Sequence, residues 1–547
     1  AHSVKGSPFE KWKDKEEKES NRWESRKHSP SVIDPAVGEG VFLKAALAQG
    51  FTAPKYVFGV DLDEEVKEEW IKINLLKSFG SRAELNKHFY HQNGLMLLDK
   101  KTVLRYKKGG LKEFDAVVGN PPYGGIGLSE TKLDDDLIVS LSKYEILSQN
   151  IKNQLITADT QGILLPSTAE KAHKVSAKAR SRLKSIPIEI LFIDRFIQLA
   201  KPGGWIAIII PDGILTNSNS HYVREFISKK ARVEAVVSLP RGAFKNVGTS
   251  AKTSLLFLQK YKDQGQRQDN YPVFLASVDS LDEKNFNFIK NTYQKYYDKT
   301  MSNKNLVQIT TDENGRELVM VRVDKTLKEM MEERPASRWD TNYWHPRYEE
   351  LLDIMASNYP IDILDKFIPQ GTEGITYGQV GKREYVKRNG TPYIRVGNII
   401  FTGVDLVTDY KEIKKEGWND PVRSRINEGN ILIVSSGATI GKIAISPTFG
   451  DYGQIVQDVD KVTFNNLNHY YFVVFYKSVF GQIQIDRFRT GTGVEHLDFE
   501  EIRSIKIPIL PENVQTNIES AYKKMPKYHD QAMRRRKIIR QRNTKIT

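Results

Sequence analysis

The feature that most constrains the fold of this chain is an alternation of short apolar runs with longer polar or amphipathic stretches. Between residues 31 and 259, six runs have the character of strands: SVID, YVFGVD, FDAVVGN, WIAIIIP, RVEAVVSL and TSLLFLQ. Several are apolar almost throughout, as expected of strands covered on both faces. Strands that alternate with helices indicate a sheet with helices on both sides. We therefore predict a doubly wound, Rossmann-like α/β fold for this region.

The remainder of the chain has a different pattern, which indicates further domains. A length of 547 residues exceeds one ordinary hydrophobic core. Short strands with many Gly and Asn turns follow the first region, and apolar residues at helical spacing come last. We expect four parts: a charged N-terminal segment (1–30), the α/β domain (31–330), a mixed α/β domain (335–511) and a long, basic C-terminal helix (512–547).

Composition narrows the class of partner and excludes some chemistry. Lys and Arg total 82 against 68 for Asp and Glu, which gives a net charge of +14. This surplus favours a polyanion such as nucleic acid, although a merely basic protein also fits. The chain has no Cys, which excludes disulfides and thiolate chemistry and is consistent with a reducing cytoplasm. Because no run of about 18 apolar residues occurs, we expect no membrane span. We also predict no metal site.

The ends of the first two strands indicate a nucleoside ligand. The run DPAVGEG, which begins at Asp34, directly follows the first strand, and Gly38 and Gly40 permit close approach of backbone to a ligand. The turn is neither GxGxxG nor a P-loop. The second strand ends at Asp61, where an acid can accept hydrogen bonds from ribose hydroxyls. Asp61 could instead cap the next helix, but Asp63 fits that position better. These residues alone do not separate NAD from S-adenosylmethionine.

A rigid corner follows the run FDAVVG and indicates the chemistry. FDAVVG runs into Asn120, Pro121, Pro122 and Tyr123, and the two prolines end the strand and fix the turn. The Asn120 side-chain oxygen and the Pro121 carbonyl can each accept one N–H of an exocyclic amine, which frees its lone pair for attack. Tyr123 offers a stacking face for a flipped base. A simple strand-ending turn is the alternative, but the acidic glycine turn upstream disfavours it.

These motifs carry a resemblance to a known family. DPAVGEGVFL and VVGNPPYGG resemble motifs I and IV of amino-methyltransferases of DNA, in the order of the γ class. PDGIL, LPRGAF and GTSAKTSLLFL are similar to the modification subunit of type I restriction–modification systems and to type IIG fusions. The resemblance implies S-adenosylmethionine as the cofactor, the N6 amine of an adenine flipped from double-stranded DNA as the acceptor, and a prokaryotic cytoplasm as the location.

The resemblance also assigns roles to individual residues. It places Asp34, Gly38 and Gly40 at the methionine part of the cofactor and Asp61 at the ribose. Asn93 stands where the family often has Asp near the cofactor's adenine. The cofactor set is completed by Pro35, Ala36, Leu62 and Gly94, and the target base is held by Asn120, Pro121, Pro122 and Tyr123. Phe244 falls where a second aromatic contacts the base in related enzymes, and a plain core role for it is equally open.

The second half of the chain resembles a target-recognition domain of type I specificity subunits. The resemblance rests on SRWDTNYWHPRYEEL, YIRVGNI, ILIVSSGATIGKIAI and GTGVEHLDFEEIRSIKIPILPENVQTNI. One such domain and one terminal helix make half of a type I specificity subunit, so a homodimer through that helix is one expectation. A restriction subunit is another expected partner. The candidate DNA contacts are Lys382, Arg383, Arg395, Arg487 and Arg489, each of which is otherwise a solvated residue.

Three other functions remain open from the sequence. Protein-glutamine and RNA methyltransferases also use NPPY, because their amide or amine nitrogen needs the same two acceptors. The chain could also be the modification and specificity portion of a bifunctional type IIG enzyme whose nuclease lies upstream. A non-catalytic DNA-binding module is the third alternative. Transfer of labelled methyl groups to DNA, RNA and release factor separates the first of these.

Overall fold

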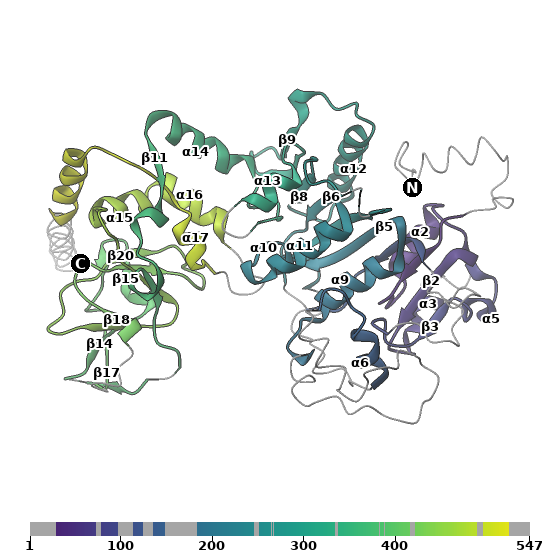
Figure 1. The fold of residues 1–547 in the computed structure, drawn as a ribbon, viewed down its shortest axis with the longest axis horizontal. Coiled ribbons are helices and arrows are strands. Elements are labelled where there is room, and N and C mark those ends of the chain that lie inside the picture. Colours follow the sequence, from purple (N-terminus) through teal and green to yellow (C-terminus); the bar gives the residue numbers. More distant parts are fainter. Residues whose placement is uncertain are drawn as a thin grey trace, which may run out of the picture. The chain divides into compact units, whose positions relative to one another are not determined.

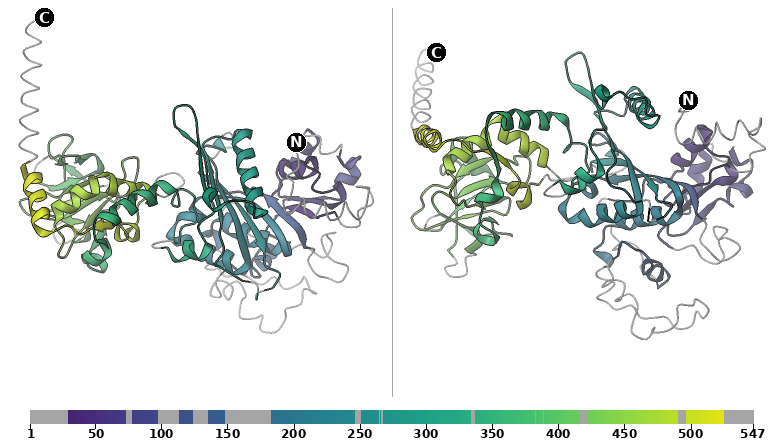
Figure 2. Two further views of the ribbon diagram at one scale, coloured as in Figure 1. Left: turned by 90° about the horizontal axis from the view of Figure 1, so that it is seen from above. Right: turned by 45° about the horizontal axis from the view of Figure 1, so that its top comes forward.

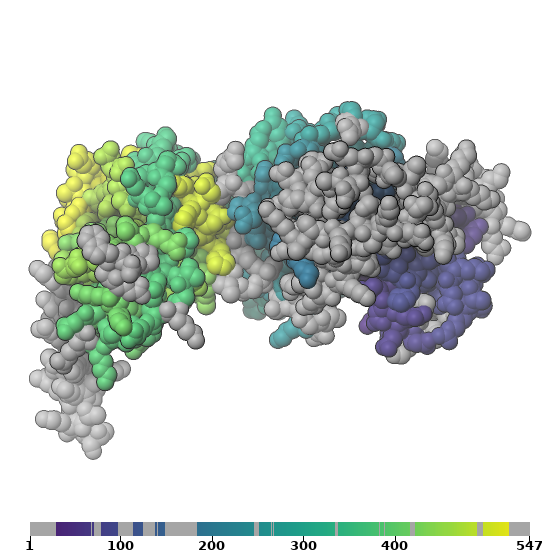
Figure 3. Space-filling view, turned by 60° about the horizontal axis from the view of Figure 1, so that its bottom comes forward, coloured from purple at the N-terminus to yellow at the C-terminus, as the bar shows by residue number. Residues whose placement is uncertain are grey.

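Two compact units make up the computed structural model of the chain, which describes residues 29–72, 78–96, 113–123, 135–147, 183–245, 251–263, 265, 267–333, 337–381, 383–387, 389–415, 422–489 and 496–524. The first unit comprises the described residues up to Glu333 together with Ser337–Asn342, and the second those from Tyr343 onward. Figure 1 shows the strands and helices of each unit, and Figure 3 shows the surface of the second unit in green to yellow.

The first unit is built on a ten-stranded mixed sheet with the order β3-β2-β1-β4-β5-β7-β6-β8-β10-β9. Its first five strands in sequence are parallel to one another: β1 (Val32–Asp34), β2 (Val57–Asp61), β3 (Phe89–His91), β4 (Phe114–Gly119) and β5 (Ala200–Pro211). Strand β7 (Thr253–Lys260) runs antiparallel between β5 and β6 (Ala231–Ser238). The outer strands are β8 (Phe274–Val278), β10 (Glu317–Arg322) and β9 (Val307–Thr311).

Helices connect these strands and cover the sheet (Figures 1 and 2). They are α2 (Val41–Ala48), α3 (Val66–Lys72), α5 (Arg82–Leu85), α6 (Asp135–Leu141), α9 (Ile188–Leu199), α10 (Gly213–Thr216), α11 (His221–Lys230), α12 (Glu283–Tyr297) and α13 (Leu327–Glu332), with 3-10 turns at η2 (Pro54–Tyr56), η4 (Ser218–Ser220) and η7 (Asn303–Asn305). From β1, an inner strand, the chain passes outward through β2 to the edge strand β3 and then returns to β4 on the other side of β1. The reversal between β1 and β4 makes their carboxyl ends the expected ligand-binding edge.

The doubly wound α/β prediction is confirmed, and each of the six predicted runs contains a strand. Hydrophobicity explains this agreement, because β1, β2 and β4 bury almost every residue. One core cluster joins Val32, Val57 and Phe89 of the sheet to Leu43 of α2 and Trp70 of α3. The pattern did not predict β3, where only Phe89 is buried, or the added strands β8, β10 and β9.

The second unit contains small sheets rather than one large one. A four-stranded sheet has the order β12 (Ile375–Tyr377), β22 (Val459–Val462), β19 (Ile431–Val434) and β20 (Ile443–Ile445). A five-stranded sheet has the order β13 (Tyr385–Val386), β17 (Lys411–Ile413), β14 (Thr391–Ile394), β21 (Gly453–Ile455) and β18 (Arg425–Ile426). Two short pairs add β11 (Ile361–Ile363) with β23 (Lys506–Pro508), and β15 (Ile399–Ile400) with β16 (Gly403–Val404).

Helices complete this unit, and a pair of strands joins its early and late segments. They are α14 (Pro346–Asn358), α15 (His469–Lys477), α16 (Val479–Phe488) and α17 (Phe499–Arg503), with 3-10 turns η8 (Leu364–Phe367), η9 (Gly371–Glu373), η10 (Val396–Asn398) and η12 (Val422–Ser424). The antiparallel pair β11–β23 joins the start of the unit to its end. Residues 512–524 are helical, at the start of the expected C-terminal helix. Lys382, residues 1–28 and the basic stretch beyond residue 524 lie outside the described residues.

Candidate active site

The first unit brings the acidic glycine turn and the Asn-Pro-Pro-Tyr corner to one edge of the sheet. β1 and β4 are parallel neighbours, with Ile33 opposite Val117. Asp34, the last residue of β1, and Asn120, the first residue after β4, therefore lie at the same edge of the sheet. The two motifs also touch. A Cβ on Gly119 would lie 2.5 Å from Oδ1 of Asp34, so only glycine lets β4 pass this close to the carboxyl group. The two motifs are far apart in the sequence, and the pairing of β1 with β4 brings them together.

Asp34 is a deeply buried acid at this edge. Its side chain is 1% exposed, and Oδ1 accepts a 3.0 Å hydrogen bond from the Ala36 N–H. Oδ2 is buried and has no hydrogen-bond partner among the described residues. Burial, with a smaller contribution from the negative charge of Asp61, raises the pKa of Asp34 to about 8, although the hydrogen bond from the Ala36 N–H opposes the shift. A cation or a hydrogen-bond donor at Oδ2 would relieve this unfavourable burial.

The turn after β1 is held to the end of β2. Gly38 has φ +46° and Gly40 has φ +76°, which L side chains rarely adopt, and α2 begins directly after Gly40. The Gly38 N–H donates to Oδ2 of Asp61 at 2.7 Å, and the Gly38 carbonyl accepts from the Trp70 indole at 2.7 Å. A Cβ on Gly38 would meet nothing within 4 Å among the described residues, which therefore leave open space over this turn. The turn can therefore admit a ligand.

Asp61 lies at the end of β2 and orders its surroundings. Its Oδ1 accepts the Asp63 N–H at 3.0 Å while Oδ2 holds the Gly38 N–H. Each carboxylate oxygen has further lone pairs for the hydroxyls of a ribose. The next residue, Leu62, is 59% exposed despite being apolar. An acid beside an exposed apolar side chain suits a nucleoside, which has a polar sugar and an apolar base.

The loop after β3 packs against the turn after β1. A Cβ on Gly94 would lie 1.9 Å from the carbonyl oxygen of Pro35, so this contact requires glycine. The Asn93 side-chain oxygen accepts the Leu95 N–H at 3.0 Å, which ties the loop to itself. The structure therefore brings the predicted cofactor residues of three strand ends, β1, β2 and β3, to one edge.

The Asn-Pro-Pro-Tyr corner presents a free acceptor. Oδ1 of Asn120 is buried and lacks a hydrogen-bond partner within the described part of the chain. Pro121 is buried, Pro122 is exposed and Tyr123 is 9% exposed. Burial raises the pKa of the Tyr123 hydroxyl, and a hydrogen bond with the Asn120 side chain opposes that shift. A buried amide oxygen without a donor is what an incoming amine N–H requires.

Phe244 follows β6, whose carboxyl end lies at the same edge as that of β5 because β7 is antiparallel to both. The ring is half-buried and packs against the core cluster that includes Leu239, Phe274 and Val321. This placement is compatible with both roles considered for Phe244. The sequence also left Asp212, which follows β5, without a role. Asp212 is buried and accepts a 2.7 Å hydrogen bond from the Ser254 hydroxyl.

The basic candidates of the second unit have different surroundings. Arg487 is 6% exposed, donates from Nε to the Tyr343 carbonyl at 3.0 Å and lies over the Tyr343 ring, which leaves little surface for a phosphate. Arg395 is half-buried and donates to the Asp409 carboxylate at 2.6 Å. Arg489 lies 3.2 Å from the Asp486 carboxylate, and Arg383 is half-buried.

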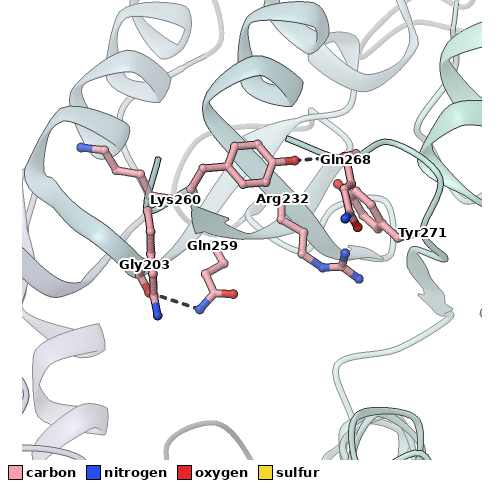
Figure 4. A pocket seen from close by; sticks show the side chains of 8 residues that line it. Gly203, Arg232, Gln259, Lys260, Gln268 and Tyr271 are labelled. Atoms are coloured by element: carbon pink, nitrogen blue, oxygen red, sulfur yellow. Dashed lines mark hydrogen bonds between the residues drawn. The ribbon is translucent and has the colours of Figure 1, made fainter. Parts of the chain in front are cut away.

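A cavity of about 160 Å³ lies at the other edge of the sheet (Figure 4). Its lining residues are Gly203, Arg232, Gln259, Lys260, Tyr261, Lys262, Gln268 and Tyr271. They lie near the start of β5 and β6 and the end of β7, so this cavity is separate from the candidate active site. Among the described residues, no group of three His, Asp or Glu side chains is placed to hold a metal ion, and no helix is long and apolar enough to cross a membrane.

Fold and site define the class of the first unit. A sheet of order 3-2-1-4-5-7-6 with an acidic glycine turn after β1 has the fold of class I methyltransferases. Residues 176–319 match the family model described as N-6 DNA Methylase, and residues 55–244 match that of Eco57I restriction-modification methylase. Residues 378–531 match the type I restriction modification DNA specificity domain. By these matches residues 55–319 resemble the N6-adenine DNA methyltransferases of restriction–modification systems, and residues 378–531 resemble a type I specificity domain.

Individual relatives are distant. Defense against restriction protein B of Escherichia phage P1 is 33% identical over 70 residues, which cover 13% of this chain and only 3% of that protein. The type IIG restriction endonuclease BpuSI is 15% identical, with 90% of this chain and 58% of that chain covered and a TM-score of 0.40. A type I methyltransferase subunit from Streptococcus thermophilus is 17% identical, covers 54% of this chain and 51% of its own, and has a TM-score of 0.32. A class I S-adenosylmethionine-dependent methyltransferase from Listeria monocytogenes is 22% identical over 50% of this chain and 66% of that chain, with a TM-score of 0.31.

Proposed function

We propose that the chain transfers a methyl group from S-adenosylmethionine to the N6 amine of an adenine flipped out of double-stranded DNA, at sites selected by the second unit. The observation that carries this proposal is the juxtaposition of two unpartnered buried oxygens, Oδ2 of Asp34 and Oδ1 of Asn120, after neighbouring strands β1 and β4. One suits a cationic donor, and the other suits the N–H of an acceptor amine.

The residues present fit the cofactor. The open space over Gly38, the unpartnered Oδ2 of Asp34 and the acid Asp61 beside exposed Leu62 provide for a charged methionine end, a ribose and an apolar base. We therefore assign Asp34, Gly38 and Gly40 to the methionine part and Asp61 to the ribose. Pro35, Ala36, Leu62, Asn93 and Gly94 complete the set. When bound, S-adenosylmethionine supplies a methyl group on a sulfonium that leaves as a neutral thioether.

Asn120 and Pro121 position the attacking amine. Their two oxygens accept its two N–H groups, which draws the nitrogen lone pair out of the purine ring and toward the methyl carbon. The new bond joins N6 to the methyl carbon as the carbon–sulfur bond breaks, and N6 then releases one proton to solvent. Tyr123 stacks on the flipped base and offsets part of the unstacking cost. The rigid proline pair keeps these groups in place.

The remaining parts of the proposal concern location and partners. We also propose the prokaryotic cytoplasm as the location and a restriction subunit as a partner, which the similarity to restriction–modification methylases supports. The second unit anchors the terminal helix: Asn468 donates to Glu519 at 2.7 Å, and the Tyr470 and Tyr522 rings lie 5.6 Å apart. We propose that the chain forms a homodimer through its C-terminal region, which light scattering of the full chain tests.

Transfer of labelled methyl groups tests the central proposal. The chain is incubated with labelled S-adenosylmethionine and, separately, double-stranded DNA, RNA and a release factor. We expect label in DNA alone, as N6-methyladenine after digestion, at a small set of sequences. Label in RNA or protein with none in DNA would replace the substrate class and retain the fold.

A further inference from the structure

Helix α9 carries two adjacent buried charges close to the candidate cofactor site. Ten of its twelve residues are buried, and Asp194 and Arg195 at its middle are each 1% exposed. A buried charge is costly unless its hydrogen bonds are satisfied. The partners of these two side chains therefore indicate why a buried helix retains them.

Arg195 holds the loop that follows β3. Its Nε donates to the Gly94 carbonyl at 3.0 Å, and its Nη2 donates to the Met96 carbonyl at 2.8 Å. The loop is the same one that packs against Pro35 through Gly94. One guanidinium thus fixes two peptide planes of a loop that lies 99 and 101 residues earlier in the chain.

Tyr144 holds the carbonyl between those two. Its hydroxyl donates to the Leu95 carbonyl at 2.6 Å, and its side chain is fully buried. Asp194 in turn accepts the Ile146 N–H at 2.9 Å, which ties the segment containing Tyr144 to α9. Three successive carbonyls, those of Gly94, Leu95 and Met96, are therefore bound from behind by two buried side chains.

We propose that Arg195 and Tyr144 are positioning residues for cofactor binding: they fix the loop after β3 in the shape that receives the adenine end of S-adenosylmethionine. This inference rests on the proposed function. A peptide plane held through its carbonyl cannot rotate, so the directions of the neighbouring N–H groups are set before a ligand arrives. Such preorganisation removes an ordering cost from binding. Neither residue touches the reacting atoms in this proposal, so the cofactor affinity should depend on them and the chemical step should not.

Two conservative variants of the full-length chain, Tyr144→Phe and Arg195→Lys, test the proposal. Matched controls are Tyr271→Phe, which loses the acceptor of a 2.8 Å hydrogen bond from the Val233 N–H, and Arg322→Lys, which loses the two guanidinium hydrogen bonds to the partly buried Asp324 carboxylate. Both controls lie in the first unit, away from β3. Calorimetry gives the Kd for S-adenosylmethionine, thermal unfolding gives the Tm, and methylation kinetics give kcat and KM for DNA.

Loss of one hydrogen bond to the loop is expected to weaken cofactor binding about fivefold in Tyr144→Phe and more in Arg195→Lys. The kcat at saturating cofactor and the KM for DNA should stay within about twofold of wild type. Amides of residues 93–96 should also exchange faster with deuterium in the free variants. The controls should lower Tm without changing the Kd.

Each other outcome contradicts the inference. A cofactor Kd that is unchanged in Tyr144→Phe, or that rises equally in the controls, makes these residues ordinary parts of the core. If Arg195→Lys fails to fold, Tyr144→Phe and its amide exchange still decide the matter, because that variant keeps the buried ring. A wild-type chain that does not bind S-adenosylmethionine overturns the proposed function and this inference together, whereas wild-type binding with unaffected variants overturns the inference alone.

Discussion

Asp34 Oδ2 and Asn120 Oδ1 are buried oxygens for which the described residues supply no donor. Each such atom costs about 1–3 kcal/mol of folding free energy, and a ligand that supplies a donor at these two positions would offset that cost. Asp61, at the same edge, already accepts one backbone N–H on each carboxylate oxygen and keeps further lone pairs for a ligand. Asp61 therefore both orders the turn after β1 and can bind a ligand, whereas the two unsatisfied oxygens depend on a ligand for their hydrogen bonds.

Asn120→Ala removes the amide acceptor without disturbing the turn after β1. We expect methyl transfer to fall by at least about 100-fold, as when a preorganised hydrogen-bonding group is lost from a catalytic site. Affinity for S-adenosylmethionine should change less than about threefold, because Asn120 acts on the base. Single-turnover methylation and calorimetry measure the two quantities. Wild-type turnover in this variant would falsify the assigned role.

Asp34 should make cofactor binding depend on pH. With its pKa raised to about 8, the carboxyl group of the free protein is largely neutral at pH 6–7. A bound sulfonium favours the charged carboxylate, so binding lowers this pKa and releases a proton. Affinity for S-adenosylmethionine should therefore rise as pH increases from 6 to 8 and level off above that, by at most about tenfold per pH unit.

The matched comparison is Asp34→Asn, for which calorimetry should give a nearly flat pH profile. S-adenosylhomocysteine, which lacks the sulfonium charge, should show a weaker pH dependence with the wild-type chain. If the wild-type affinity does not vary between pH 6 and 8, or if the Asn variant shows the same slope, the charge relation between Asp34 and the cofactor is wrong.

At the scale of elements, the sequence predicted those strands and turns whose burial or backbone restriction determines the residue types. Buried parallel strands consist of apolar runs, and the prolines after β4 mark its end. The sheet edge that carries the candidate site could therefore be predicted from the residue pattern. The pattern is blind to contacts between distant segments. The sequence around Gly94 does not indicate its contact with Arg195, which lies 101 residues later. Strand β3 has too few buried residues to be recognised as an apolar run. The antiparallel position of β7 also depends on pairing, which composition does not encode.

Glycine contacts between elements give a sharp test of this edge. In Gly94→Ala the added methyl would lie 1.9 Å from the Pro35 carbonyl oxygen, a backbone atom that cannot rotate away. We expect a loss of about 2–4 kcal/mol in the free energy of unfolding, together with weakened cofactor binding. Urea denaturation and calorimetry measure both effects.

Gly315→Ala is the control for that variant. Gly315 has φ +78° in the turn between β9 and β10, where a Cβ meets nothing within 4 Å. Figure 2 shows this turn projecting from the sheet. Only the cost of a positive φ applies there, about 1–2 kcal/mol, and cofactor affinity should be unchanged. Equal losses in the two variants would mean that the Gly94 contact relaxes freely.

At the scale of the whole molecule, the two ligands of the proposed reaction should respond differently to salt. The chain carries a net charge of +14, and a basic protein that contacts DNA phosphates releases counterions on binding. If about six phosphates are contacted, DNA affinity should fall about 1,000-fold between 50 and 200 mM salt. In the proposed site the cofactor makes short-range contacts within one unit, so its affinity should change less than about threefold over the same range. Fluorescence anisotropy with a labelled duplex and calorimetry with S-adenosylmethionine measure the two slopes on one preparation. Equal slopes, or a DNA affinity that ignores salt, would contradict a DNA-binding role for the basic surplus.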